Sequence, residues 1–413
     1  MGRWSWYSIC VFFLWSLGTL LAGDWPQILG PHRSGVYVGS PLTWTWKGGE
    51  PERLWGKEVG EGFAGPAVFK DQLFLFHRVS DFEVLQCFRK STGEFLWRSR
   101  AKASYRDRMG FNSGPRAVPT VTEDMVVTMG ANGLIRALSR EEGRLLWEVE
   151  AQSSYQADAG FFGFACSPLV TDDLVIAQIG GRRGAGLVAF DRQSGKLRWK
   201  ATSDEAGYAS PTQFLLRDRT VLACFNREGF VGLDPTNGEV LARYPWRAKM
   251  HASVNAATPL QIDDQRVFLS ASYQAGATVL DLGELAKPRP VWAGNDILSN
   301  HYATSVYHKG YLYGFHGRQE RSPALRCVNA DSGDVVWTKP AYGGGAILGV
   351  GDRLLIMRES GELVMIKGSP ENYVELTSGQ ILGREARALP AFSSGVLYAR
   401  DDRILVAVRL GKE

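Results

Sequence analysis

The sequence predicts an all-β fold, an eight-bladed β-propeller built from four-stranded antiparallel blades. Two observations lead to this prediction. Short apolar runs are broken by Gly- and Asp-containing turns about every 8 to 12 residues, which is typical of antiparallel strands. A turn-and-strand pattern also recurs with a period of roughly 40 to 50 residues, as expected of propeller blades. The alternative is an all-β sandwich in which the repeated spacing is accidental.

Residues 167–199 contain one complete unit of four short runs. Its last two runs, with the turn between them, recur as LQCFRKSTGEFLW (85–97), IRALSREEGRLLW (135–147), LVAFDRQSGKLRW (187–199) and LRCVNADSGDVVW (325–337). In each copy a Gly stands four residues before a Trp. The Gly permits a turn with positive φ, and the Trp can bury its large apolar surface against a neighbouring unit.

Two further copies are degenerate. Residues 231–246 have Ala242 where the Trp is expected, and residues 278–292 keep a Trp but lack the Gly turn. We expect a structural role between blades for six tryptophans: Trp55, Trp97, Trp147, Trp199, Trp292 and Trp337.

The N-terminal residues 1–23 are predicted to be a signal peptide, because Arg3 precedes an uncharged apolar stretch that ends near Ala22. An uncleaved anchor is the alternative, since the stretch is almost long enough to span a membrane. Residues 24–52 form a lead-in rich in Trp, Pro and Gly, and residues 53–413 form a single propeller domain. We therefore expect an exported protein, periplasmic or extracellular, and a monomer.

The two ends of the propeller domain look incomplete. Residues 53–60 resemble an outer strand without three strands before it, and residues 388–410 supply three strands without a fourth. The N-terminal strand should therefore complete the last blade, which removes an exposed sheet edge. Eight innermost strands are expected to open at Pro66, Pro119, Pro168, Pro211, Pro259, Thr304, Ala346 and Pro390. The unit at 346–376 lacks a Trp, and its loss would leave seven blades.

Composition excludes some function classes. The net charge is +4 and no run of Lys and Arg interleaves with aromatic residues, so no nucleic-acid partner is expected. No CxxC or CxxCH occurs, which argues against a zinc knuckle or covalent haem. We expect Cys87, Cys166, Cys224 and Cys327 to be buried free thiols.

Two segments carry a family resemblance. AFDRQSGKLRW (189–199) and CVNADSGDVVW (327–337) resemble the tryptophan-docking repeats of pyrroloquinoline-quinone-like (PQQ-like, quinoprotein-type) propellers. DWPQILGPHRSGV (24–36) resembles the opening of exported bacterial proteins of this class. The resemblance covers about residues 24–410 and implies the propeller fold. It also implies two kinds of function: quinone-dependent alcohol or sugar dehydrogenation, or non-enzymatic scaffolding of outer-membrane barrel assembly.

The sequence departs from the quinone-dependent enzymes that it resembles. It has no adjacent Cys-Cys pair, and we expect the loop carboxylates Glu61, Asp107 and Asp158 to be isolated rather than gathered around calcium. We therefore expect no cofactor and no metal site, with PQQ kept as the alternative.

The loops on one face of the propeller hold the candidate ligand-binding residues. In a four-stranded blade, the loop before the first strand and the loop between strands two and three emerge on the same face. The candidates on this loop face are His77, Arg108, Asn112, Arg116, Tyr208, His251, Asn255, His301, Tyr302, His316, Arg358 and Arg387. Arg can bind anions through bidentate hydrogen bonds, and Tyr offers stacking surfaces. We expect this face to be basic, the opposite face to be acidic, and the positive charge to keep the histidines neutral.

These observations favour a non-catalytic binding or scaffold module for a protein or for an anionic or glycan ligand. Ordinary solvated loops are the simplest alternative for this face. A quinone-dependent oxidoreductase, or another enzyme using the same face, is the alternative function. No G-x-S-x-G motif or evident Ser/His/Asp set is present, so no catalytic residue is identified and the question of catalysis stays open.

Overall fold

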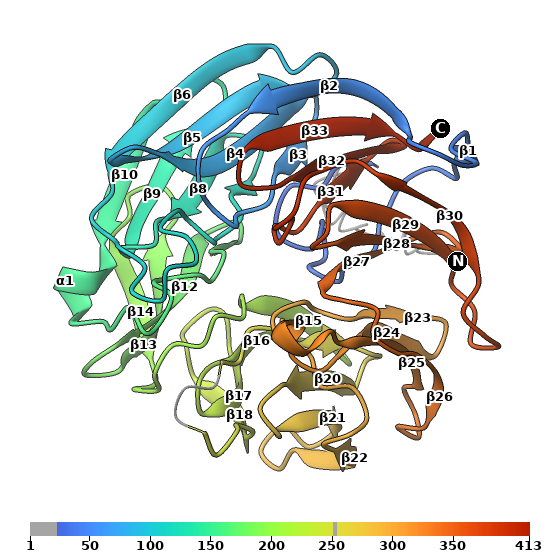
Figure 1. Ribbon diagram of the computed structural model, residues 1–413. Helices are drawn as coiled ribbons and strands as arrows, with labels where there is room; N and C mark the ends of the chain where they lie inside the picture. The colour runs from blue at the N-terminus through green and yellow to red at the C-terminus, as the bar shows by residue number, and fades with distance from the viewer. Residues whose placement is uncertain (1–22, 251–253) are drawn as a thin grey trace, which may run out of the picture.

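Eight four-stranded antiparallel sheets are arranged in a ring in the computed structural model, which describes residues 23–250 and 254–413 (Figure 1). The predicted eight-bladed propeller is confirmed. The predicted signal peptide lies outside the described residues except for Gly23. Neither of the two helical turns described, α1 (Ala151–Tyr155) and η1 (Gln319–Arg321), approaches the length that a membrane-crossing helix needs.

The first four blades follow the chain, each running from its innermost to its outermost strand. Blade 1 contains β3 (Ala67–Phe69), β4 (Gln72–Val79), β5 (Phe82–Arg89) and β6 (Phe95–Lys102). Blade 2 contains β7 (Thr120–Val121), β8 (Met125–Met129), β9 (Leu134–Ser139) and β10 (Leu145–Glu150). Blade 3 contains β11 (Leu169–Val170), β12 (Leu174–Gly181), β13 (Ala185–Asp191) and β14 (Leu197–Ala201). Blade 4 contains β15 (Thr212–Leu216), β16 (Arg219–Phe225), β17 (Gly229–Leu233) and β18 (Val240–Pro245).

The last four blades complete the ring. Blade 5 contains β19 (Leu260–Gln261), β20 (Arg266–Ala271), β21 (Gly276–Asp281) and β22 (Arg289–Gly294). Blade 6 contains β23 (Val306–His308), β24 (Tyr311–His316), β25 (Ala324–Asn329) and β26 (Val335–Lys339). Blade 7 contains β27 (Gly345–Val350), β28 (Arg353–Arg358), β29 (Glu362–Lys367) and β30 (Glu375–Gln380). Blade 8 contains β31 (Ala391–Ser393), β32 (Val396–Arg400), β33 (Ile404–Arg409) and β2 (Glu52–Glu58).

Proline marks the start of six innermost strands, those of blades 1 to 5 and of blade 8. Each strand begins at the residue after the proline. Proline has no N–H to give to a sheet and favours an extended residue before it, so it suits the first position of a strand. The unit at 346–376, whose loss would have left seven blades, forms blade 7.

Ring closure joins the two ends of the chain, as predicted. β2 pairs antiparallel with β33, and Figure 1 shows this N-terminal strand in blue beside the red C-terminal one. A second antiparallel pair joins β1 (Thr43–Trp44) to β34 (Gly411–Lys412). Tyr37 of the lead-in also donates a 2.8 Å hydrogen bond to the carboxylate of Glu413.

A buried histidine fastens the end of β2 to blade 1. The Gly60 N–H donates to Nδ1 of His77 at 2.7 Å, and Nε2 of His77 lies 2.7 Å from the side-chain oxygen of Gln86. Arg400 of blade 8 donates to the Gly60 carbonyl at 2.6 Å. Burial, with a smaller contribution from Arg400, lowers the pKa of His77 to about 4. The imidazole is therefore neutral at pH 7 and accepts the Gly60 hydrogen bond.

An indole N–H connects each of six blades to the next one. Its acceptor is a backbone carbonyl in or beside the turn before the next blade's outermost strand, at 2.8–3.1 Å. The donor and acceptor pairs are Trp55–Lys90, Trp97–Arg140, Trp147–Arg192, Trp199–Pro235, Trp292–Ala330 and Trp337–Ser369. The first four of these indoles are buried, and the last two are half-buried.

The repeated glycine packs against the tryptophan of the preceding blade. A Cβ added to Gly143, for example, would lie 2.3 Å from the Trp97 ring, and one added to Gly195 would lie 2.7 Å from Trp147. Both glycines also have positive φ, 68° in each case. Glycine is therefore required for two reasons: the turn needs a positive φ, and the neighbouring indole leaves no room for a Cβ.

The two degenerate copies fall on either side of one interface. Blade 4 has Ala242 at the tryptophan position, paired with Gly232, and blade 5 lacks the glycine turn that such a tryptophan would meet. Blade 7 has Thr377 at the same position, and in blade 8 the chain ends replace the turn. Tryptophan and glycine partners are thus missing together, at the interfaces between blades 4 and 5 and between blades 7 and 8.

The lead-in lies against the innermost strands. Trp25 and Val68 of β3 exchange two backbone hydrogen bonds, and the Val121 N–H of β7 donates to the Pro26 carbonyl. In blade 7, the Gly349 N–H of β27 donates a hydrogen bond to the Gly35 carbonyl, and the Gly349 carbonyl accepts one from the Tyr37 N–H. The lead-in therefore extends the inner edges of blades 1, 2 and 7.

We predict that Trp199→Ala lowers the free energy of unfolding by about 3–5 kcal/mol, because it removes a buried indole and leaves the Pro235 carbonyl without its donor. Leu197→Ala, two residues away on the exposed side of the same strand, should change stability by less than about 0.5 kcal/mol. Chemical denaturation of both variants measures the difference. A similar loss in both would mean that the indole does not hold blades 3 and 4 together.

We predict that the protein loses stability as the pH falls from 6.5 towards 4. The pKa of His77 is lower in the folded state, so protonation favours the unfolded chain throughout this range. The shift corresponds to about 3 kcal/mol. Denaturation at pH 7 and pH 4.5 should show a smaller fall for His77→Gln than for the wild type. His32→Gln is the control, because His32 is exposed, and it should keep the wild-type pH dependence. Equal falls in all three proteins would contradict the assignment.

Candidate functional site

An arc of aromatic and charged side chains crosses the loops of the loop face. It draws residues from the inter-blade loops leading into blades 1 to 4, 6 and 8 and from two hairpins. The arc contains Phe63, Tyr105, Asp107, Phe111, Arg116, Phe161, Phe162, Tyr208, Tyr273, His301, Tyr302, Glu359 and Arg387. Five of the twelve residues predicted from the sequence lie in it: Arg116, Tyr208, His301, Tyr302 and Arg387.

Arg116 is the centre of one half of the arc. Its guanidinium lies 5.6 Å from the ring centres of Phe63 and Tyr105 and 5.9 Å from that of Phe162. It also forms an ion pair with Asp107 at 3.3 Å, and its side chain is only 11% exposed. An arginine held between aromatic faces and a carboxylate is fixed in position, because each partner removes rotational freedom.

The loop that carries Arg116 is organised by Asp107. This carboxylate accepts hydrogen bonds from the backbone N–H groups of Met109, Phe111 and Asn112, and its side chain is 2% exposed. Asp107 is therefore engaged by backbone amides and by Arg116, a pairing that the sequence did not indicate. Asn112, another predicted site residue, has a structural role here. Its backbone carbonyl accepts a hydrogen bond from the Arg116 guanidinium, and its side-chain oxygen accepts one from the Gly114 N–H.

The arc continues from Phe162 to blade 4. The rings of Phe162 and Tyr208 lie 5.7 Å apart. The Tyr208 hydroxyl accepts from the backbone N–H groups of Phe161 and Phe162 at 2.9 and 3.2 Å. Tyr208 therefore holds the loop before blade 3 in place.

Glu359 links the other half of the arc. Its carboxylate accepts a hydrogen bond from the Tyr302 hydroxyl and lies 3.3 Å from Nε of Arg387. Burial, followed by the charge of Glu359, raises the pKa of Tyr302 well above its ordinary value, so this phenol stays protonated. Arg387 in turn lies within 6 Å of the ring centres of Phe63 and Phe111, at 5.8 and 5.7 Å.

His301 extends this half towards blade 5. Its Nε2 lies 2.7 Å from the Tyr273 hydroxyl, and its Nδ1 bonds to the side-chain oxygen of Gln319. Burial lowers the pKa of His301. The imidazole is thus neutral, but the first cause is burial rather than the arginine charge that the sequence suggested.

The other predicted residues are not brought into the arc. His77 and Asn255 are buried, and Asn255 donates to the carbonyls of Asn226 and Trp246. His316 accepts from the Ser299 N–H and lies 3.1 Å from Asp296. Arg358 bonds to Glu362 and to the Tyr342 carbonyl. Arg108 is exposed, and His251 lies outside the described residues.

Carboxylates neutralise much of the expected positive charge of this face. Arg116, Arg358 and Arg387 each form an ion pair with an acidic residue. On the opposite face, the turn residues Asp124 and Asp263 pair with arginines as well. The prediction of a basic face opposite an acidic one is therefore weakened, because the sequence does not show which charges meet in space.

The described part of the chain contains no group of three or more His, Cys, Asp or Glu side chains that could hold a metal ion. The two best-placed carboxylates of the arc are already engaged: Asp107 by backbone amides and Arg116, and Glu359 by Tyr302 and Arg387. These residues do not fit a calcium-bound quinone, which needs several free oxygen ligands. Cys87, Cys166, Cys224 and Cys327 are buried and free, as expected.

Two large apolar side chains are exposed on the loop that Asp107 organises. Met109 is 58% exposed and Phe111 is 48% exposed. Phe111 lies 6.2 Å from Phe162, so it continues the aromatic arc to the surface. An exposed aromatic ring on a loop whose backbone is fixed is typical of a protein-binding residue. Sequence reasoning missed Phe63, Phe111 and Phe162, although aromatic residues clustered in loops were the available indication.

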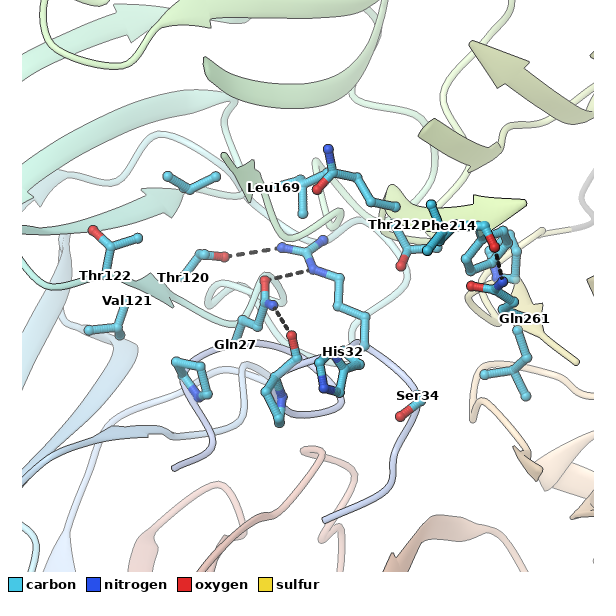
Figure 2. Close-up of a pocket in the computed structure, with 18 of the residues that line it drawn as sticks. Gln27, His32, Ser34, Thr120, Val121, Thr122, Leu169, Thr212, Phe214 and Gln261 are labelled. Carbon is cyan, nitrogen blue, oxygen red and sulfur yellow. Dashed lines mark hydrogen bonds between the residues drawn. The ribbon is translucent and has the colours of Figure 1, made fainter. Parts of the chain in front are cut away.

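A cavity of about 730 Å³ lies on the opposite face, where the strand-one-to-two turns emerge. Figure 2 shows Gln27, His32 and Ser34 of the lead-in on one side of it and Leu169, Thr212 and Phe214 of blades 3 and 4 on the other. Arg33 is buried at its base. It donates to the carbonyls of Ser167, Pro168 and Pro211 and to the side chains of Gln27 and Thr120.

The chain is similar to proteins of known fold over most of its length. Outer membrane protein assembly factor BamB of Shewanella oneidensis is 24% identical over 388 residues, which cover 88% of each chain. The crystal structure of BamB from Moraxella catarrhalis has a TM-score of 0.62 at 14% identity, covering 90% of this chain and 98% of that one. Quinohemoprotein alcohol dehydrogenase ADHIIG from Pseudomonas putida HK5 has a TM-score of 0.68 at 12% identity, covering 95% and 81%.

These two structural likenesses establish a shared propeller fold and, at such low identity, nothing further. The family is shown by the sequence itself. The model of the family described as outer membrane protein assembly factor BamB matches residues 49–215 and 159–320, about two thirds of the chain. The chain therefore belongs to this family of PQQ-like β-propellers.

Proposed function

We propose that this chain is an exported scaffold of the cell envelope that binds a protein partner through its loop face, around Met109 and Phe111. The observation that carries the proposal is the fixed aromatic and arginine arc that ends in these two exposed side chains. Residues 1–23 would direct export, and the propeller from residue 53 would act as one binding domain.

The comparisons support a protein partner. The relative from Shewanella oneidensis is named as a factor in outer membrane protein assembly, and the family carries the same description. A propeller offers a rigid, wide surface on which loops are held by the blades, which suits the binding of another protein.

The alternatives have less support. An anionic or glycan ligand bound in the arc would need free guanidinium groups, but Arg116 and Arg387 already have carboxylate partners there, and the exposed Arg108 lies outside the arc. A quinone-dependent oxidoreductase would need calcium ligands, but Asp107 and Glu359 are engaged by arginines and hydrogen bonds. A protein partner requires neither, because it can use the exposed apolar side chains directly.

Site-specific photo-crosslinking in the source organism tests the proposal. A photoreactive phenylalanine analogue placed at position 109 or 111 should give one dominant crosslinked protein. The matched control is position 95, because Phe95 is also about half exposed, at 51%, but lies in the outermost strand of blade 1. The same crosslinking probe there should not capture this protein.

Binding of the purified partner then decides the contribution of the site. Phe111→Asp should weaken binding roughly tenfold or more, because it places a charge in an apolar contact. Phe95→Asp should leave the affinity unchanged. Equal crosslinking at positions 95 and 111, or equal affinity of both variants, would contradict the proposal.

A further inference from the structure

The cavity on the opposite face is half closed by the chain's own lead-in. The lead-in forms five backbone hydrogen bonds with the inner edges of three blades: two with Val68, one with Val121 and two with Gly349. On the far side the cavity is lined by the innermost strands of blades 3, 4 and 5, which the lead-in does not pair with. The inner edges of blades 1, 2 and 7 therefore form backbone hydrogen bonds with an added segment, whereas, within the described residues, those of blades 3, 4 and 5 do not.

The inner edge of β15 has free backbone groups that point towards the cavity. β15 and β16 are joined by a two-residue turn, so Leu216 and Arg219 form the hydrogen-bonded pair that closes this hairpin. Alternation along the strand then turns the backbone groups of Gln213 and Leu215 away from β16. The Leu215 carbonyl accordingly accepts from the side chain of Gln261 at 2.6 Å.

The remaining groups of this edge have no partner within residues 23–250 and 254–413: the N–H and carbonyl of Gln213 and the N–H of Leu215. Both residues are exposed, and Leu215 is the most exposed of the large apolar side chains described, at 60%. An edge strand with free amides and an exposed apolar side chain can accept an additional strand.

Acidic side chains surround this part of the cavity. Asp172 lines it, and Asp218 and Asp264 line a smaller hollow that adjoins it beyond Leu216. None of these three carboxylates has an ion-pair partner among the described residues, whereas Asp263 is paired with Arg266. On the other side, His32 is exposed and Arg33 already gives its hydrogen bonds to protein oxygens. Arg217 also lines the smaller hollow and bonds to the neutral side chain of Gln265, so the three carboxylates still leave an excess of negative charge that complements a basic ligand.

We propose that this cavity binds an extended, lysine-containing peptide segment of a partner protein, which pairs with the inner edge of β15 as the lead-in pairs with β3, β7 and β27. Backbone hydrogen bonds to Gln213 and Leu215 hold the segment, and Asp172, Asp218 and Asp264 select its basic side chains. This site lies on the face opposite to the loop face and is independent of the function proposed above.

Fluorescence anisotropy with a labelled eight-residue peptide of alternating Lys and Val tests the site on the full-length protein. Leu215→Pro removes the free N–H, and proline is tolerated where the N–H of an edge strand faces solvent. We expect this variant to bind roughly fivefold to tenfold more weakly than the wild type. The matched variant Leu215→Ala keeps the N–H, so its affinity for the peptide should fall clearly less than that of Leu215→Pro. A thermal melt of each variant checks that it is folded.

Two altered peptides separate backbone pairing from charge. A peptide with alternate backbone nitrogens methylated should not bind, and a peptide with Glu in place of Lys should bind at least about tenfold more weakly. Hydrogen exchange should slow at Gln213 and Leu215 when the Lys-Val peptide is bound.

Four results with these peptides and variants would overturn the proposal, and a fifth concerns the oligomeric state. The four are equal binding of the methylated peptide, equal binding of the Glu peptide, unchanged affinity of Leu215→Pro, and protection confined to the loop face. Concentration-dependent dimers that Leu215→Pro abolishes would also overturn it, because the occupant of this edge would then be a second copy of the chain.

Discussion

The contact on which the ring depends is the hydrogen bond from an indole of one blade to a carbonyl of the next. In a propeller each blade meets only its two neighbours, so the stability of the ring is approximately a sum of blade terms and interface terms. Here six of the eight interfaces share one form. The tryptophan supplies apolar area and a donor, and the next blade supplies an acceptor. At five of these six interfaces the next blade also supplies a glycine, whose missing Cβ leaves room for the indole ring. The repeated pattern in the sequence is thus a contact between blades as much as a turn within one.

The fold could be predicted from the sequence because its determinants are local and repeated. Prolines before innermost strands, glycine turns and the tryptophan spacing are each visible within a dozen residues, and the incomplete blade ends showed how the ring closes. The functional surface was only partly predictable. Arg116 and Arg387 were identified as loop-face arginines, but their partners Asp107 and Glu359 were not. His77 and Asn255 lie in loop-face positions by sequence and are buried in the structure. Pairing across loops depends on loop conformation, which no local pattern encodes.

The lead-in shows how a segment without strand periodicity becomes part of a β-fold. It contributes edges and one long side chain. Arg33 is almost fully buried and forms no ion pair with a carboxylate of the described residues, and burial lowers its pKa to about 9, so it remains charged at neutral pH. Isolated buried charge is costly, but five hydrogen bonds to protein oxygens satisfy its donors. Two of the three carbonyl acceptors belong to prolines that open blades 3 and 4, so the same arginine fixes the lead-in and aligns two neighbouring inner strands.

The two interfaces without an indole contact divide the ring into two unequal groups of blades. Blades 8, 1, 2, 3 and 4 form an unbroken series of tryptophan contacts, and blades 5, 6 and 7 form another. The lead-in and the C-terminal strand β34 cover the junction between blades 7 and 8, where Trp46 packs in the same apolar cluster. Within residues 23–250 and 254–413, the lead-in does not reach the junction between blades 4 and 5, which is filled by an apolar cluster that includes Phe230, Ala242 and Leu280. This junction borders both hollows of the face opposite the loop face. This junction lacks the directional indole hydrogen bond that six other blade pairs have, so we expect it to allow more relative movement of its two blades than those pairs do. Movement there would widen or narrow the opening beside β15. The five blades linked by indole contacts carry most of the aromatic arc, and they would move together.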